Sequence, residues 1–364
     1  MKLSIEKNIL LNGVSTVSKA VSNKTTLSIL DCILLSANNN QLTLTANNTE
    51  LGIESILECD VIENGIIAIN SKIFSDIVRK LPDGIVNINC SDDYIVNIVC
   101  GKVKFKISGK SGDEFVMLPE INREDYIEIP QIVLKNAIDK TIFSISNNDI
   151  NKTLTGELFE IKNDILRICS LDGHRMSIRN IELNKNYNDK SVIVPGKTLI
   201  EVSKIITGSE DNINIYFMDK HIVFEYDNTT IVSRLIEGKF HNFEQLLQNE
   251  FNTKVDINKR ELSGCIDRAT LLVKDGDSKS IIFRINDENI EIMMNTTIGS
   301  LNEEIPIIKE GDDIDIGFNP RFLLDALKAI DEDDITLYMT GKKFPCFIKD
   351  NENKYIYIVL PVNF

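Results

Sequence analysis

Hydrophobic and polar positions alternate with a period of two along most of the chain. Runs such as QLTLTA, YIVNIVC, VKFKIS and YIYIVLPV are separated by Asn, Asp and Gly, which is typical of short antiparallel strands joined by turns. Six segments instead space their apolar residues at about 3.6, which predicts amphipathic helices. These segments are residues 6–21, 70–81, 130–145, 195–206, 258–273 and 319–330. The pattern therefore predicts an α+β protein.

The spacing of the six helical segments reveals an internal repeat. Taken in pairs, their starts lie 64, 65 and 61 residues apart, and the first helices of successive pairs start 124 and 128 residues apart. Three units of helix, strands, helix and strands account for the whole 364-residue chain, and polar connectors at 119–128 and 248–257 separate them. We therefore expect three similar domains, at 1–122, 123–250 and 251–364.

A second feature recurs in the same register. ANNTELGIES begins 40 residues after the first helix starts, SLDGHRMSIR 40 residues after the third, and MNTTIGSLNE 36 residues after the fifth. Each is a polar turn followed by an alternating strand. The turn that carries Asp172, His174 and Arg175 is therefore the middle copy of a structural turn, which weakens an acid/base interpretation of these residues.

Catalysis has little support in the sequence. General acid/base work needs a nucleophile or a metal beside Asp172 and His174, and no HExxH, paired CxxC or GxSxG motif occurs. ISGKSGD does not form a phosphate loop, because Lys104 stands where that loop needs Gly. We expect no catalytic site, no metal and no cofactor. The seven cysteines form no CxxC pair and are expected to be reduced thiols, most of them in apolar runs: Cys32, Cys59, Cys90, Cys100, Cys169, Cys265 and Cys346.

Charge is distributed unevenly between the helices and the rest of the chain. The net charge is −15, yet each of the six helical segments carries +1 or +2. A single environment for all six helices explains this better than six unrelated solvated faces, and a phosphate backbone bound without sequence specificity fits modest positive charge. A repeat scaffold that binds protein partners without encircling DNA is the alternative, and it predicts helix charges of mixed sign.

No apolar run approaches the ~20 residues of a membrane span. The N-terminal segment lacks the basic, apolar and small-residue regions of a signal peptide. We expect a cytoplasmic protein without a membrane partner.

Six segments together resemble one family. They are LTLTANNTELGI, LDGHRMS, VPGKTLIEV, LIEGKFHNFEQLL, IGFNPRFLLDAL and YIVLPVNF, and they extend over the chain in the order of the bacterial DNA polymerase III β subunit, the sliding clamp. The resemblance implies a head-to-tail homodimer that closes into a ring, with helices inside and antiparallel sheets outside. Such a ring is a processivity factor rather than an enzyme. It holds double-stranded DNA by topology, and a separate clamp loader opens it.

The resemblance also implies an apolar cleft between the second and third domains. Short peptides of the replicative polymerase, the clamp loader and repair proteins would bind there. The deep subsite would consist of Leu154, Leu171, Gly173, His174, Arg175, Met176, His241, Leu246, Ile358 and Leu360. The shallower subsite would consist of Asn319, Phe322, Pro345, Val359, Pro361 and Val362, with His174 bordering both. His241, Leu171 and Phe364 depart from the family pattern, so the peptide preference stays open.

DNA contacts and the dimer seam follow from the same resemblance. The cations expected near DNA are Lys24 and Lys152 on loops, then Lys7, Lys19, Lys72, Arg79, Lys80, Lys197 and Lys204 on helices. The seam would pair Phe105 and Ile107 of one chain with Leu271 and Leu272 of the other.

Overall fold

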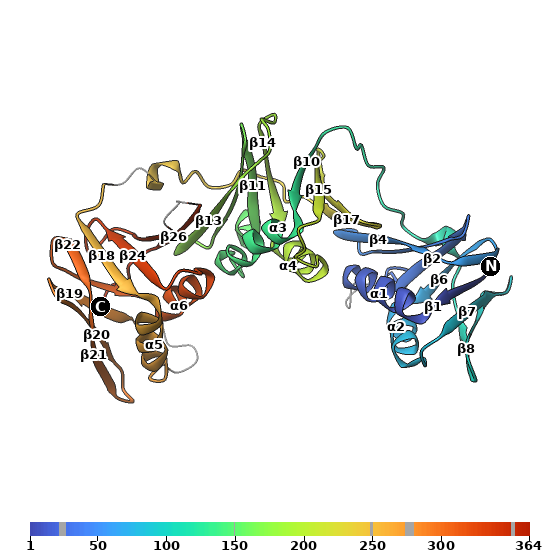
Figure 1. Ribbon diagram of the computed structural model, residues 1–364, viewed down its shortest axis with the longest axis horizontal. Coiled ribbons are helices and arrows are strands. Elements are labelled where there is room, and N and C mark those ends of the chain that lie inside the picture. The colour runs from blue at the N-terminus through green and yellow to red at the C-terminus, as the bar shows by residue number, and fades with distance from the viewer. Residues whose placement is uncertain (22–26, 149, 248–249, 274–279, 351–353) are drawn as a thin grey trace. The chain divides into compact units, whose positions relative to one another are not determined.

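The computed structural model describes residues 1–21, 27–148, 150–247, 250–273, 280–350 and 354–364. These residues form two compact units (Figure 1). The first unit contains residues 1–131 and 204–235, and the second contains 132–203 and 236–364.

All six expected helices are present, with shorter ends. They are α1 Lys7–Val17, α2 Ser71–Lys80, α3 Gln131–Asp139, α4 Gly196–Ile205, α5 Lys259–Thr270 and α6 Pro320–Ala329. Asn70, Asn258 and Asn319 cap α2, α5 and α6 by accepting backbone N–H groups of the first turn, which explains why these helices start where they do.

The expected helix at 130–145 is too long. The Thr141 hydroxyl donates to the Ala137 carbonyl oxygen at 2.7 Å, and Thr141 leaves helical geometry with ψ −35° and φ −124°. A short 3-10 turn, Ile142–Ser144, then continues the apolar spacing that made the segment look helical.

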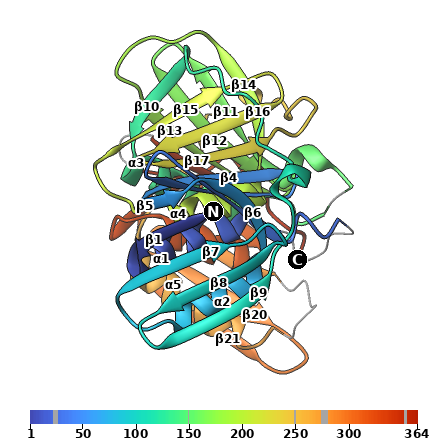
Figure 2. The same ribbon diagram turned by 90° about the vertical axis from the view of Figure 1, so that its right-hand side faces the viewer.

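Two sheets build the first unit. The five-stranded sheet has the order β5-β1-β7-β8-β9, and Figure 2 shows β7, β8 and β9 side by side. Its strands are β1 Lys2–Glu6, β5 Asp60–Glu63, β7 Ile85–Cys90, β8 Ile95–Cys100 and β9 Val103–Ser108. The eight-stranded sheet has the order β10-β15-β16-β17-β4-β3-β2-β6. Its strands are β2 Cys32–Asn38, β3 Gln41–Asn47, β4 Leu51–Glu58, β6 Gly65–Asn70, β10 Tyr126–Pro130, β15 Asn212–Phe217, β16 His221–Tyr226 and β17 Thr229–Arg234.

Two further sheets build the second unit. The nine-stranded sheet has the order β14-β11-β12-β13-β26-β25-β24-β18-β22. Its strands are β11 Gly156–Lys162, β12 Ile165–Leu171, β13 Arg175–Glu182, β14 Lys190–Pro195, β18 Thr253–Asn258, β22 Ile308–Gly311, β24 Asp334–Met339, β25 Cys346–Lys349 and β26 Tyr355–Val359. The four-stranded sheet has the order β21-β20-β19-β23. Its strands are β19 Ile281–Ile285, β20 Asn289–Asn295, β21 Ser300–Pro306 and β23 Ile314–Phe318.

Two of these sheets cross a boundary between sequence repeats. β17 of the middle repeat pairs antiparallel with β4 of the first, and β26 of the third repeat pairs antiparallel with β13 of the middle one. In both cases, the last strand of one repeat joins the strand that follows the polar turn of the preceding repeat. Backbone hydrogen bonds therefore make each junction a continuous sheet.

All seven cysteines are free thiols, of which Cys32, Cys100, Cys169, Cys265 and Cys346 are buried. In the described part of the chain, no group of three or more His, Cys, Asp and Glu side chains could hold a metal ion. None of the described helices has both the length and the apolar character needed to cross a membrane.

Candidate peptide-binding groove

The turn between β12 and β13 is held by Asp172. Its Oδ1 atom accepts the backbone N–H groups of His174 at 2.9 Å and Arg175 at 3.0 Å, and Gly173 between them has a φ of +92°. The carboxylate of Asp172 thus binds the backbone of His174. Asp172 shapes the turn, as Asn and Asp commonly do.

Arg175 is buried beneath this turn and ties it to the third repeat. Its Nε donates to Asp172 Oδ2 at 3.0 Å, and its Nη1 donates to Asp325 Oδ2 on α6 at 2.6 Å. Its Nη2 donates to the Phe143 carbonyl oxygen, and its guanidinium carbon lies 4.4 Å from the centre of the Phe322 ring. One buried cation therefore links the turn, the end of the α3 segment and α6. Such multiple contacts use the planar fork of the guanidinium group.

A cavity of about 270 Å³ opens beside the turn, within the second unit. All ten residues expected for the deep subsite line it: Leu154, Leu171, Gly173, His174, Arg175, Met176, His241, Leu246, Ile358 and Leu360. The turn supplies the rim, and β26 supplies Ile358, which pairs with Met176. A concave apolar lining with a few polar groups at its edge suits aliphatic or aromatic side chains of a peptide.

Two residues that line the cavity, Asn242 and Phe243, are absent from the set that the family resemblance implied. Phe243 is 5% exposed and packs with Met176, Phe347 and Ile358. Both residues lie in the segment GKFHNFEQLL, which carried the resemblance. The apolar, aromatic character of Phe243 between polar neighbours was the available signal.

The shallower subsite is only partly assembled at the surface. The Phe322 ring centre lies 6.3 Å from that of the exposed His174, in a stacked arrangement, and Asn319 caps the same helix. Pro361 and Val362 are half-buried, and Val362 N donates to the Gly317 carbonyl oxygen at 2.9 Å. Pro345 and Val359 are buried, and the Val359 side chain is part of the third-repeat core. None of these six residues lines the 270 Å³ cavity.

The cations expected near DNA differ in their surroundings. Lys24 lies outside the described residues. Lys72, Lys80, Lys152, Lys197 and Lys204 are exposed. Lys7 is largely buried against Asp83, with its Nζ 2.9 Å from Oδ1, and Arg79 lies 3.4 Å from Asp76. Lys19 donates to the carbonyl oxygen of Lys204 at 3.0 Å.

Acidic side chains from outside the helices neutralise part of the positive helix charge. Asp331 pairs with Lys140, Asp333 with Arg260, and Glu303 with Arg268. The helix charges counted from the sequence therefore overstate what several of these helices present to solvent. Lys72, Lys80, Lys197 and Lys328 are exposed helix cations for which no ion pair is described.

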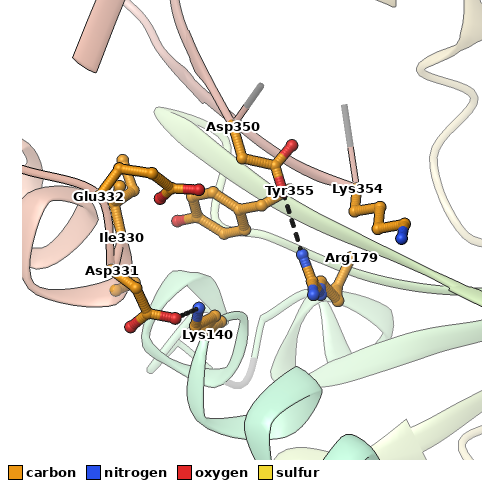
Figure 3. Close-up of a pocket in the computed structure, with 9 residues that line it drawn as sticks. Lys140, Arg179, Ile330, Asp331, Glu332, Asp350, Lys354 and Tyr355 are labelled. Carbon is orange, nitrogen blue, oxygen red and sulfur yellow. Dashed lines mark hydrogen bonds and ion pairs between the residues drawn. The ribbon is translucent and has the colours of Figure 1, made fainter. Parts of the chain in front are cut away.

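A second cavity, of about 310 Å³, lies between the ends of α3 and α6 and is polar (Figure 3). Lys140 pairs with Asp331, and Arg179 donates to Asp350 Oδ2 at 3.2 Å. Within the described part of the chain, the buried Tyr355 hydroxyl and Asp350 Oδ1 have no hydrogen-bond partner. In polar cavities of this size, water molecules are the usual hydrogen-bond partners of such groups. The balanced cations and carboxylates distinguish this cavity from the apolar groove.

The junction-spanning sheets and the groove define a class of protein: a chain of three α+β clamp domains with an apolar groove at one junction. Comparison with known proteins agrees. Residues 1–119 match the N-terminal domain of the DNA polymerase III beta subunit, residues 128–242 its central domain, and residues 244–363 its C-terminal domain.

The chain belongs to the DNA polymerase III beta subunit family. It is 31% identical to the beta sliding clamp of Staphylococcus epidermidis, over 100% of this chain and 99% of the relative. Among solved structures, a putative DNA polymerase III beta subunit from Eubacterium rectale is 55% identical, with a TM-score of 0.97 and 100% of both chains covered. The DNA polymerase sliding clamp of Bacillus subtilis is 31% identical, with a TM-score of 0.97, 100% of this chain and 99% of that one covered.

Proposed function

We propose that this chain forms a DNA sliding clamp. It is a non-catalytic processivity factor that encircles duplex DNA without sequence specificity and tethers the replicative polymerase, the clamp loader and repair proteins. Its working form is a head-to-tail homodimer of three clamp domains per chain, at 1–122, 123–250 and 251–364. The family membership over nearly the whole chain supports the general function.

The strand pairing at the two internal junctions is the observation that supports the closure of two chains into a ring. The last strand of the middle repeat joins β4, and the last strand of the third repeat joins β13. The last strand of the first repeat, β9, lies at the edge of its sheet, and so does β21, the third-repeat strand that corresponds to β4 and β13. Edge strands with unpaired backbone groups invite a partner, so β9 of one chain and β21 of a second chain fit each other.

The residues around these edges suit such a seam. Phe105 and Ile107 on β9 are half-buried, whereas Leu271 is 80% exposed just after α5. Counted from the two hairpin turns, Ile107, which pairs with Val96, occupies the position that Ser233, which pairs with Ile222, has at the first junction. Exposed Lys104 and Lys106 on β9 complement the carboxylates of β21. Leu271 and Leu272 would then be covered in the dimer.

The groove beside His174 is the docking site in this proposal. Its apolar floor takes one anchor residue of a peptide, and Phe322 together with Pro361 and Val362 offers a second, shallower contact. Because Arg175, which lines the cavity, already ties the His174 turn to Phe143 and Asp325, little ordering of the turn is needed when a peptide enters. Such preorganisation raises affinity.

The DNA contact is loose. Exposed Lys72, Lys80, Lys152 and Lys197 provide a scattered positive charge. Each phosphate contact adds to the dependence of binding on salt, and many such contacts would hold the ring in place instead of letting it slide.

Retention on circular and linear DNA tests the proposal. The dimer, a clamp loader and ATP are incubated with nicked circular DNA, and the complex is passed over a sizing column before and after the DNA is cut. We expect retention on circles at high salt and loss after linearisation. Equal, salt-sensitive binding to both forms would favour a protein-binding scaffold that does not encircle DNA. A Leu271→Ala, Leu272→Ala chain is the matched control, since its weaker dimer should be lost from circular DNA more readily than the wild type.

A further inference from the structure

The first junction contains a turn with the same hydrogen bonds as the His174 turn. Asn48 Oδ1 accepts the backbone N–H groups of Glu50 at 3.0 Å and Leu51 at 2.8 Å, as Asp172 does for His174 and Arg175. Thr49 takes a φ of +75° where Gly173 has +92°. A non-glycine residue adopts this conformation at a cost, which indicates that the turn geometry is held by its surroundings.

At both junctions, the strand from the next repeat makes the same backbone hydrogen bonds to the turn. Gly52 pairs with Val232 as Met176 pairs with Ile358. Arg234 N donates to the Glu50 carbonyl oxygen at 2.8 Å, and Leu360 N donates to that of His174 at 2.8 Å. Glu50 is therefore the structural counterpart of His174, and Asn47 and Gly52 are those of Leu171 and Met176.

A cavity of about 240 Å³ lies beside this turn, within the first unit. Its outer wall is the segment Val116–Pro119, which belongs to no helix or strand and follows Phe115 as His241–Phe243 follows Phe240 at the second junction. Val116 is 41% exposed and Met117 is 59% exposed. The Asn47 side-chain amide donates to the Val116 carbonyl oxygen at 3.0 Å and fixes this wall. Leu118 fills the space left by the missing side chain of Gly52, so the floor is closed and apolar.

Charge distinguishes this first-junction groove from the His174 groove. Glu50 is exposed, and no ion pair to it is described. Glu50 is the one Asp, Glu, Lys or Arg residue among those that line the cavity, and Glu120 follows the wall residue Pro119 in the sequence. His221 lines the opposite side, and burial, together with Arg234 and Lys220, lowers its pKa, so the imidazole is neutral at pH 7.

We propose that the first-junction groove binds a short extended peptide of a partner protein, with an aliphatic residue against Val116 and Met117 and a neighbouring Lys or Arg at Glu50. Exposed methionine adapts to different aliphatic partners, and the carboxylates select a cation. The inference rests on the proposed function in taking the His174 groove as a peptide site. Together the two grooves would let one chain engage two segments.

Methionine methyl groups report on the two grooves separately, because Met117 lines the first-junction groove and Met176 lines the His174 groove. The full-length chain is labelled with 13C at the methionine methyl groups and titrated with the peptide Ac-Ala-Leu-Lys-Ala-NH2 or with Ac-Ala-Leu-Glu-Ala-NH2. Met339, which is buried in the third-repeat core, serves as an internal reference.

We expect a saturable shift of the Met117 signal, with a Kd about three- to fivefold lower for the Lys peptide than for the Glu peptide, as an exposed ion pair allows. Glu50→Lys should reverse this preference. Glu58→Lys makes the same charge change on the exposed end of β4, outside the groove, and should leave the preference as it is. An unchanged Met117 signal, or equal affinity for both peptides in wild type and Glu50→Lys, overturns the inference. The DNA-retention experiment decides the proposed function independently, so failure of one is not failure of the other.

Discussion

In the proposed function, the His174 groove binds peptides and the cationic helices contact DNA, and the two features differ in how their residues are supported. The groove is enclosed by segments far apart in the chain, and buried Arg175 connects the turn to Asp325, 150 residues away. The helix lysines at positions 72, 80 and 197 are exposed side chains without such support. A preorganised groove concentrates binding free energy in few residues, whereas exposed charges spread it thinly. Single substitutions should therefore have large effects at the groove and small ones on the helices.

Removing the Arg175 cation should have the largest effect. Arg175→Met leaves the carboxylates of Asp172 and Asp325 without their partner, which costs about 3 kcal/mol of unfolding free energy, the low end for a buried pair because the Asp325 side chain is 35% exposed. Peptide affinity should fall by at least tenfold because the turn loses its anchor. Urea unfolding and fluorescence anisotropy with a labelled polymerase peptide measure the two effects. Arg179→Met, at the polar cavity, is the control that should keep peptide affinity. Unchanged peptide affinity in Arg175→Met would show that Arg175 does not anchor the turn for peptide binding.

Strand β11 contains a buried carboxyl group, Glu157. Burial raises the pKa of Glu157 to about 8, and the charge of Asp139 adds to this while Thr141 opposes it. Because the folded-state pKa lies above the unfolded value, this group favours folding fully below about pH 4.5, and its contribution is lost as the pH rises toward 8.

We expect the stability of the wild type to fall by roughly 3 kcal/mol between pH 4.5 and 7 relative to Glu157→Gln. Urea unfolding of both chains across this range measures the difference. Parallel stability curves for the two chains would show that the carboxyl group is not neutral in the folded protein.

The seam should respond next. Leu271→Ala, Leu272→Ala removes apolar area that the dimer would bury. Leu271 contributes most of it, because it is 80% exposed in the single chain. The dimer dissociation constant should rise by at least about tenfold, since burying one leucine contributes about 1.5–3 kcal/mol. Sedimentation velocity at nanomolar concentration measures it. Ile308→Ala, another largely exposed residue, is the control. A dimer as tight as wild type would place the seam elsewhere.

His174→Ala separates binding from stability. The side chain is exposed, and its described ring contact is with Phe322, so the unfolding temperature should stay within about 2 °C. Affinity for the polymerase peptide should fall about tenfold, as for a residue at the centre of a docking site. Calorimetry and anisotropy measure the two quantities. A loss of stability that accounts for the lost affinity would contradict a direct contact with the peptide.

The helix lysines should show the smallest effects. Lys72→Ala and Lys80→Ala should each change DNA affinity by no more than about twofold and lower the salt dependence by less than one ion per substitution. Lys7→Ala is the internal comparison, because Asp83 already pairs with Lys7 and DNA affinity should not change. A tenfold loss from one lysine would show that the helices bind DNA tightly, and the contrast with the groove would disappear.

The sequence by itself determined the elements, the threefold repeat and most of the deep groove. Apolar spacing reports which face of a segment is buried, so all six helices were found, and two of them were extended over the 3-10 turns that follow, Ser18–Ala20 after α1 and Ile142–Ser144 after α3. The ten residues of one cavity followed from the family resemblance of LDGHRM and of the segments around Leu154, His241 and Ile358, and apolar spacing alone did not give them.

The tertiary structure decided which distant side chains meet. Periodicity contains no information on the pairing of β17 with β4, on the contact of Arg175 with Asp325, or on the burial of Glu157. Net helix charge, counted along the chain, could not show that Asp83, Asp331 and Glu303 neutralise helix cations from other segments. Local spacing fixes a residue's face and conformation, whereas ion pairs, cavities and shared sheets depend on three-dimensional distances between residues remote in sequence.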